Sequence, residues 1–230
     1  MTRARTKESQ NQSQWDAYTE RGGTTLGPWS SNIWRHDPRH LGFLLARYKF
    51  CAKMLEGKKS VLEIGCGDAM GLPVLLQTVG SVHGVDFEPL VLEDAARRLK
   101  REGVSGCRLS VADLTRRPVP GRYDAAYSLD VIEHIPERLE RRFVGNIVRS
   151  LTPQGVLILG TPNITAQRYA SPASRAGHIN LKSGPDLRRL LSAYFDNVFL
   201  FSMNDEVVHT GYGPMAHYLI AMGAGRKRRS

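Results

Sequence analysis

Hydrophobic and polar positions along the chain follow two different periods. Five short apolar runs, bounded by glycine or polar residues, each predict a buried strand. These runs are residues 60–65, 81–85, 107–112, 123–128 and 155–160. Apolar residues at helical spacing precede, separate and follow the runs, at residues 40–57, 69–79, 88–102, 136–151 and 184–194. Strands that alternate with helices predict parallel βαβ units.

The end of the chain departs from this alternation. Residues 197–203 and 217–222 are two strand-like runs with no helical segment between them, so we expect them to pair antiparallel. All the runs together predict an α/β fold, a Rossmann-like three-layer sandwich. Its mostly parallel, seven-stranded sheet is expected to end in an antiparallel C-terminal hairpin.

Length and composition fit one domain. A chain of 230 residues with 41% hydrophobic content can bury a large core without dividing. No apolar run reaches the length of a membrane span and the first residues are polar, so we expect no spanning helix, no signal peptide and a soluble, cytoplasmic protein. The cysteines, Cys51, Cys66 and Cys107, lack metal-ligand spacing and predict free thiols.

The net charge of +10 comes mostly from the two ends of the chain. The basic residues there are Arg3, Arg5, Lys7, Arg226, Lys227, Arg228 and Arg229. Without them the chain holds 25 basic and 22 acidic residues and is nearly balanced. We therefore predict a flexible N-terminal segment and candidate lid at 1–38, a folded domain at 39–223 and a basic tail at 224–230.

The strongest motif, VLEIGCGDAMG, covers residues 61–71. An apolar strand runs directly into Gly65 and Gly67, where glycines let the chain turn sharply and let a ligand lie against the backbone. Asp86, at the end of the next strand, stands where an acidic side chain accepts hydrogen bonds from ribose hydroxyls. A nicotinamide enzyme offers the same pair, but the third glycine falls at Gly71, and that spacing favours a cofactor without a pyrophosphate.

Four segments resemble the class I S-adenosylmethionine-dependent methyltransferases across residues 40–222. They are E-x-G-x-G at 63–67, Asp86, VADL at 111–114 and YDAAYSLDVIEHI at 123–135. The final hairpin is also typical of that class and separates it from dehydrogenases. The resemblance implies S-adenosylmethionine as cofactor. It implies that Gly65 and Gly67, with Cys66 between them, face its methionine part, Asp86 holds the ribose, Asp113 and Leu114 meet the adenine, Glu63 orients the glycine loop and Leu129 lies beside the sulfonium.

The segment after the fourth strand carries the candidate chemistry, Asp130, Glu133 and His134. Open α/β sheets bind ligands at the carboxyl ends of their strands, and residues i, i+3 and i+4 of a helical turn share a face. The three side chains are therefore candidates to point at one cation. The alternative is a capping box, with Asp130 as N-cap and Glu133 bonded back to its amide. Pro136 disfavours the cap, because proline prefers the first turn of a helix and places these residues before it.

The acidic-x-x-Glu-His pattern resembles two methyltransferase groups, the ubiquinone-pathway O-methyltransferases and the metal-dependent 2′-O-methyltransferases of small-RNA ends. Both have glutamate where this chain has Asp130. In the RNA-end group a histidine downstream of a TPN sequence completes the metal shell, which implies His178 here, after residues 161–163. Two carboxylates and two imidazoles suit Mg²⁺, Mn²⁺, Fe²⁺ or Zn²⁺. Without a metal, His134 is the candidate general base.

Several other side chains are secondary candidates. His209, between the last two strands, is a candidate acceptor contact, and His83 is expected to pack in the core. A candidate lid and carboxylate clamp over the cofactor is formed by Trp29, Trp34, Tyr48 and Arg47, for which core packing is the alternative.

Three acceptors compete. A polar small molecule or glycan, methylated on a hydroxyl, is favoured by the balanced charge of the domain and by the polar segment 171–184. An RNA 3′ end is the alternative that the histidine pattern and the basic ends favour. A quinone precursor needs an apolar lid, and none is evident. The non-enzyme alternative, an inactive relative that only binds a nucleoside, leaves the complete cofactor motif unexplained. The sequence indicates no oligomeric state.

Overall fold

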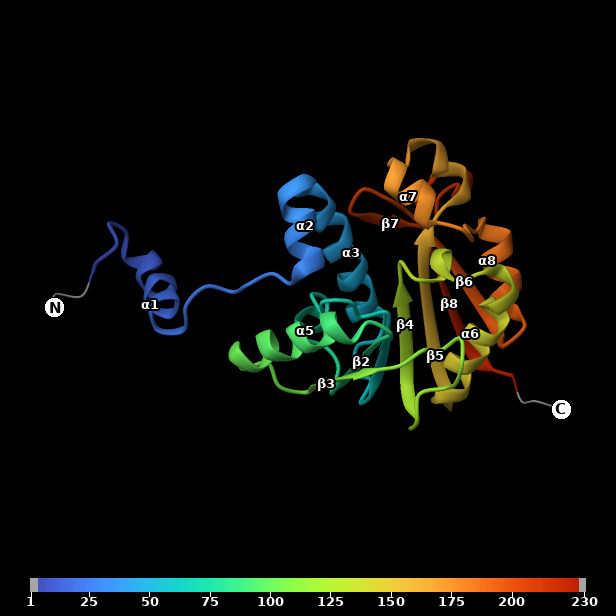
Figure 1. Ribbon diagram of the computed structural model, residues 1–230, viewed down its shortest axis with the longest axis horizontal. Helices are drawn as coiled ribbons and strands as arrows, with labels where there is room; N and C mark the ends of the chain where they lie inside the picture. Colours follow the sequence, from blue (N-terminus) through green and yellow to red (C-terminus); the bar gives the residue numbers. More distant parts are fainter. Residues whose placement is uncertain (1–3, 228–230) are drawn as a thin grey trace.

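The computed structural model describes residues 4–227, apart from the side chain of Ala173. One twisted sheet runs through the middle of the domain, with helices on both faces (Figure 1). Within the described residues its eight strands have the order β3-β2-β1-β4-β5-β8-β6-β7. The strands are β1 (Val61–Ile64), β2 (Val82–Asp86), β3 (Cys107–Val111), β4 (Tyr123–Leu129), β5 (Leu151–Pro162), β6 (Phe195–Asn204), β7 (Val207–His209) and β8 (Tyr218–Arg226).

The predicted parallel sheet and its antiparallel end are confirmed. β1 pairs with β2 on one side and with β4 on the other, and the five strands from β3 to β5 in the sheet run parallel. β8 is antiparallel to both β5 and β6. The strand order changes direction between β1 and β4, so the carboxyl ends of these two strands border the crevice in which such sheets bind ligands.

The C-terminal part of the sheet departs from the prediction in two ways. β7 pairs antiparallel with β6 after a tight turn at Asp205, whose φ is 49°, and it adds an eighth strand to the seven expected. β8 continues to Arg226, whose guanidinium donates to the carbonyl of Leu151. Residues 224–226 therefore belong to the sheet and not to a basic tail. Residues 228–230 of the predicted tail lie outside the described residues.

Helices on the two faces complete the predicted three-layer sandwich. Helices α3 (Arg39–Met54), α4 (Leu72–Leu75) and α5 (Pro89–Arg101) cover one face, and α6 (Glu137–Ser150) and α8 (Gly184–Ser192) cover the other. Successive residues of a strand point to opposite faces. In β4, Ala125 and Tyr127 accordingly pack in the core beneath α3, α4 and α5, and Ala126 packs in the core beneath α6 and α8. None of the helices between residues 4 and 227 has the length and apolar content that crossing a membrane requires.

The helix expected at 69–79 is reduced to the single turn of α4. Ala69 has a left-handed backbone, with φ of 60°, which a helix cannot include. A Cβ atom on Gly71 would lie 2.1 Å from Cε1 of Tyr48, so the chain here is pressed directly against α3. The segment after the glycine turn therefore packs against α3 and becomes helical only at Leu72.

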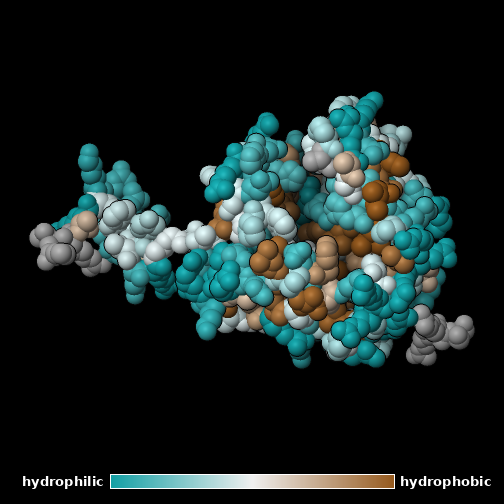
Figure 2. All heavy atoms as spheres, in the orientation of Figure 1, coloured by the Kyte–Doolittle hydropathy of each residue, from teal (hydrophilic) through white to brown (hydrophobic). Residues whose placement is uncertain are grey.

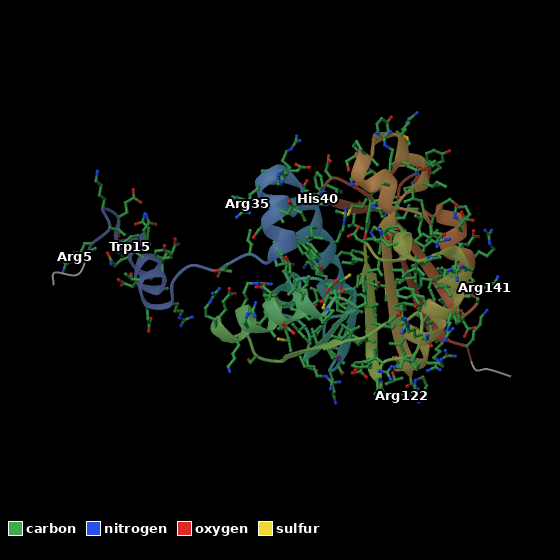
Figure 3. The ribbon with its side chains drawn as sticks, viewed as in Figure 1. Arg5, Trp15, Arg35, His40, Arg122 and Arg141 are labelled. Carbon is green, nitrogen blue, oxygen red and sulfur yellow. The ribbon has the colours of Figure 1, made fainter. Side chains whose placement is uncertain are left out.

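Within residues 4–38, the predicted N-terminal segment and candidate lid is partly helical. It contains η1 (Ser9–Asn11), α1 (Gln12–Arg21) and α2 (Pro28–His36). α1 stands apart from the domain at the end of an extended stretch, whereas α2 lies beside α3 (Figure 1). Arg5 and Trp15 lie on the projecting arm (Figure 3). α2 is therefore part of the folded domain, whereas α1 is not packed against it.

His83 links three strands at the amino-terminal side of the sheet, as the core position predicted for it suggests. Its Nδ1 atom lies 2.5 Å from the Tyr123 hydroxyl and its Nε2 atom 2.7 Å from Ser110 Oγ. Arg108 also donates to the Tyr123 hydroxyl. Burial, followed by the charge of Arg108, lowers the pKa of His83 to about 4. The imidazole is therefore neutral in the folded protein at neutral pH.

We predict that His83 makes the stability fall with acidification. Between pH 6.5 and 4 the unfolded chain binds a proton at this position and the folded chain does not, so the free energy of unfolding decreases as the pH falls. Denaturant unfolding at pH 7 and pH 5 should show a decrease roughly 1 kcal/mol larger for the native chain than for His83→Gln. Replacement of the exposed His36 by Gln is the control, and equal decreases for the native chain and His83→Gln would contradict the assignment.

Candidate functional site

A cleft of about 600 Å³ lies at the carboxyl ends of β1, β2 and β4. Figure 2 shows a hollow with hydrophobic side chains at its floor, between the part of the molecule that carries α2 and α3 and the part that carries α7 (Pro172–Gly177). The structure brings almost all predicted cofactor residues to this cleft: Gly65, Cys66, Gly67, Asp86, Asp113, Leu114 and Leu129 line it. Glu63 lies behind the lining, within β1.

The glycine turn is held directly against its neighbours. Gly65 has φ of 76°, and a Cβ atom on it would lie 2.2 Å from Cγ2 of Val131, so backbone shape and space both require glycine. The amide of Gly67 donates to Asp86 Oδ2 over 2.9 Å, and the amide of Glu88 donates to Asp86 Oδ1. Asp86 is therefore oriented by the backbone of the turn before any ligand arrives.

Glu63 is buried beneath the glycine turn. Burial raises its pKa to about 7, and the nearby hydroxyls of Tyr127 and Tyr48 partly oppose that rise. Within the described residues its Oε2 atom has no hydrogen-bond partner. This location fits the role implied for Glu63, supporting the turn from behind.

α2 covers the glycine turn through Asp68, a residue that sequence reasoning missed. Asp68 Oδ2 accepts the amide of Ser30 over 2.7 Å, Oδ1 accepts the Ser30 hydroxyl, and the Asp68 carbonyl accepts from Arg98. The indole of Trp29 lies against Gly67, where a Cβ atom would be 3.0 Å from Trp29 Cδ1. Trp29 thus borders the cleft as a lid residue would, whereas Trp34 is exposed and lies outside the lining.

Asp113 and Leu114, which the resemblance assigns to the adenine, lie together in the lining of the cleft. Leu114 is buried, and Asp113 is oriented by its bonds to the amide and hydroxyl of Thr115. Leu129, at the end of β4, closes the floor.

Asp130 does not join the predicted metal cluster. Its φ is 57°, and its carboxylate accepts two bonds from Arg47, at 2.8 and 2.9 Å. Arg47 is in turn stacked on the ring of Tyr218, 3.8 Å from its centre, which places the guanidinium on Asp130 and not in the open cleft. The left-handed backbone at Asp130 breaks the helical i, i+3, i+4 geometry on which the four-ligand prediction depended.

The capping alternative is also absent from the structure. A short turn, η2 (Ile132–His134), follows Asp130, and its N-cap is Val131, with no side-chain cap bond. Neither Asp130 nor Glu133 is therefore engaged in capping η2.

Glu133, His134 and His178 do come together. Within the described residues they form a cluster whose ligand atoms all lie within 4.8 Å of one another, with Glu133 buried, His134 exposed and His178 half-buried. The segment of His178 is attached to the turn after β4, because Asn180 donates its amide to the Glu133 carbonyl and its side chain to the Ile135 carbonyl. Sequence reasoning missed Asn180, two residues after His178.

The donors of this cluster fit a divalent cation. Glu133 is fully buried; Thr161 donates to its Oε2 atom, while its Oε1 atom has no partner among the described residues. Burial, reinforced by the charge of Asp130, raises the pKa of Glu133 to about 8. His134 Nδ1 lies 2.9 Å from the Gly177 carbonyl, the bond that leaves the other ring nitrogen free as a ligand. Burial, followed by His134, lowers the pKa of His178 and favours its neutral form.

His209 is placed elsewhere. Its Nε2 atom lies 3.0 Å from Asn204 Oδ1, and its Nδ1 atom accepts the amide of Gly211. Both ring nitrogens are therefore used within the β6–β7 hairpin region, and His209 does not line the cleft.

Comparison with known proteins finds methyltransferases. A family described as a methyltransferase domain matches residues 61–155. The ubiquinone biosynthesis O-methyltransferase of Pseudomonas aeruginosa is 30% identical over 116 residues, 50% of this chain and 49% of that protein. A probable S-adenosylmethionine-dependent methyltransferase of Mycolicibacterium smegmatis is 28% identical over 106 residues, 46% of this chain and 38% of that protein. The chain thus spans half or less of the length of these curated relatives.

The fold is shared with solved methyltransferases. The methyltransferase domain of bacterial CtHen1 superposes with a TM-score of 0.66 at 21% identity, covering 79% of this chain and 98% of that domain. Sheet order, glycine turn and family match together define a methyltransferase domain of the Rossmann-like kind. Over residues 61–155 the chain matches a methyltransferase domain, and it is similar in sequence to S-adenosylmethionine-dependent methyltransferases and in fold to solved methyltransferase domains.

We predict that Asp86→Ala weakens binding of S-adenosylmethionine and of its demethylated product at least about tenfold, equivalent to about 1.4 kcal/mol. The substitution removes both the expected ribose acceptor and the support of the Gly67 amide. Calorimetric titration measures it, with Glu93→Ala on the exposed face of α5 as control. Equal affinity in Asp86→Ala and the native chain would contradict the role of Asp86.

Proposed function

We propose that the protein transfers the methyl group of S-adenosylmethionine to a hydroxyl of a polar small molecule or sugar, assisted by a divalent cation held by Glu133, His134 and His178. The observation that carries the proposal is the position of this cluster. His134 lines the cofactor cleft, so the cluster opens onto the space where the methyl group is expected.

The residues of the chain divide the chemistry between them. A divalent cation, when bound, lowers the pKa of a hydroxyl that it contacts and so makes the oxygen a better nucleophile. Glu133 supplies the negative charge of the cation site, and the two imidazoles supply neutral nitrogen ligands. Asp86, Gly65 and Gly67 hold the cofactor on the other side. Alignment of the hydroxyl with the methyl group is then the main catalytic contribution of the protein.

A single experiment distinguishes the proposed acceptor from the alternatives. Native protein is incubated with a host extract and isotopically labelled S-adenosylmethionine, and the labelled product is identified by mass spectrometry. A labelled neutral metabolite or glycan supports the proposal. Labelled RNA would contradict the proposal and indicate methylation of an RNA 3′ end. A labelled quinone precursor would indicate methylation of that precursor instead. Absence of any methyl transfer would indicate a protein that only binds a nucleoside.

We predict that the cluster binds the cation as one unit. His134→Ala and His178→Ala should each lower Mn²⁺ affinity at least about tenfold and remove most turnover, and the double variant should lose little more, because ligands that act together are non-additive. Calorimetry, elemental analysis and turnover after chelation and metal re-addition measure this.

His209→Ala is the matched control, because that imidazole lies outside the cluster. Full turnover in metal-free protein, with unchanged Mn²⁺ affinity in both variants, would eliminate the cation and leave His134 as the candidate base.

We also predict that removal of residues 1–21 leaves cofactor affinity and turnover of a small acceptor within about twofold, because α1 stands apart from the domain (Figure 1). A polyanionic acceptor predicts the opposite, since Arg3, Arg5, Lys7 and Arg21 would be lost. Turnover measured at low and high salt distinguishes the two, and a large, salt-dependent loss would favour RNA.

A further inference from the structure

A second cavity, of about 390 Å³, adjoins the histidine cluster on the side away from the cofactor cleft. It is lined by α6, α8, η3 (Ile164–Tyr169) and the segment 178–182. His178 lines this cavity, and His134 lines the cofactor cleft. Because the two imidazoles belong to one cluster, that cluster lies between the two cavities.

We propose that this second cavity binds the non-reacting part of the acceptor, and that the acceptor is a neutral, polyhydroxylated molecule such as the terminal sugars of a glycan. The inference rests on the proposed function, because it takes the reacting hydroxyl to lie at the histidine cluster. The volume falls within the range of small-molecule sites, about 300–1,000 Å³.

The charges of the cavity are balanced and mostly paired with one another. Lys182 is buried, lies 2.5 Å from Glu140 and donates to Asn180. Arg189 pairs with Asp186, which also caps α8. These internal pairs leave no excess of positive charge to attract a phosphate group.

Three polar side chains remain available at the cavity. Glu137, Arg141 and Gln167 line it, and none of the three side chains has a hydrogen-bond or ion-pair partner within residues 4–227. Arg141 lies at the outer edge of α6, on the side of α8 (Figure 3). A carboxylate, a guanidinium and an amide offer donors and acceptors together, which suits sugar hydroxyls, since each hydroxyl both donates and accepts.

A polyanionic acceptor fits the same cavity poorly. Glu137, Glu140 and Asp186 place as many carboxylates around it as there are cationic side chains. An RNA strand leading away from the histidine cluster along this path would bring its phosphates close to those carboxylates. The cavity therefore favours a glycan over RNA.

The test measures binding separately from turnover. Uncharged disaccharides (maltose, cellobiose, lactose and sucrose) are titrated into the full chain, saturated with S-adenosylhomocysteine and Mn²⁺, and followed by saturation-transfer NMR. At least one should bind the native chain. Glu137→Ala and Arg141→Ala should each weaken that binding about tenfold or more, with unchanged S-adenosylhomocysteine affinity by calorimetry.

Arg138→Ala, on the same helix but outside the cavity lining, is the matched control and should bind like the native chain. The inference is overturned if no disaccharide binds while S-adenosylhomocysteine does, or if the cavity variants bind as the control does. It is also overturned if a short RNA with a free 3′ end binds instead and is weakened by Arg141→Ala. Failure to bind S-adenosylhomocysteine at all would count against the proposed function itself, and melting temperatures identify variants that fail to fold.

Discussion

The ion pair between Arg47 and Asp130 fixes the turn after β4, and both halves of the site depend on that turn. Asp130 has a left-handed backbone, which is unfavourable for a residue other than glycine. Its two bonds to the buried Arg47, and the bond from its amide to the Gly160 carbonyl, offset that cost. The turn then places Val131 against Gly65 on the cofactor side and sends Glu133 inward on the other side.

Two buried carboxyl groups flank this turn, and their surroundings differ in a way that suits different roles. Burial raises the pKa of both Glu63 and Glu133. Glu63 faces the hydroxyls of tyrosines, which can hydrogen-bond to it without adding charge. Among the described residues one oxygen of Glu133 has no partner, and the carboxyl group lies next to two imidazoles. Arg47, whose charge acts on Glu133, is already bonded to Asp130. A buried carboxylate without a compensating charge is unfavourable, so this second position is the one that a cation would stabilise.

The sequence was sufficient for those parts of the site that local pattern controls. The glycine turn and Asp86 follow strands of clear periodicity, and Glu133 and His134 are adjacent in the chain, so their positions could be predicted. The role of Asp130 could not, because it depends on a left-handed φ and on a partner 83 residues away. Asp68 and Asn180 were missed for the same reason: each acts through a backbone or side-chain bond to a distant segment. The eighth strand is three residues long and carries too little pattern to be recognised.

The two cavities are built from different parts of the chain, and no residue between 4 and 227 lines both of them. The cofactor cleft uses α2, the β1 and β2 turns and the end of β4, whereas the second cavity uses α6, η3, α8 and the segment around His178. They meet at the histidine cluster, where the bonds of Asn180 attach one part to the other. Substitutions on α8 or η3 can therefore alter the second cavity without altering the cofactor cleft, whereas a change that loosens Asn180 separates His178 from Glu133 and affects both cavities at once.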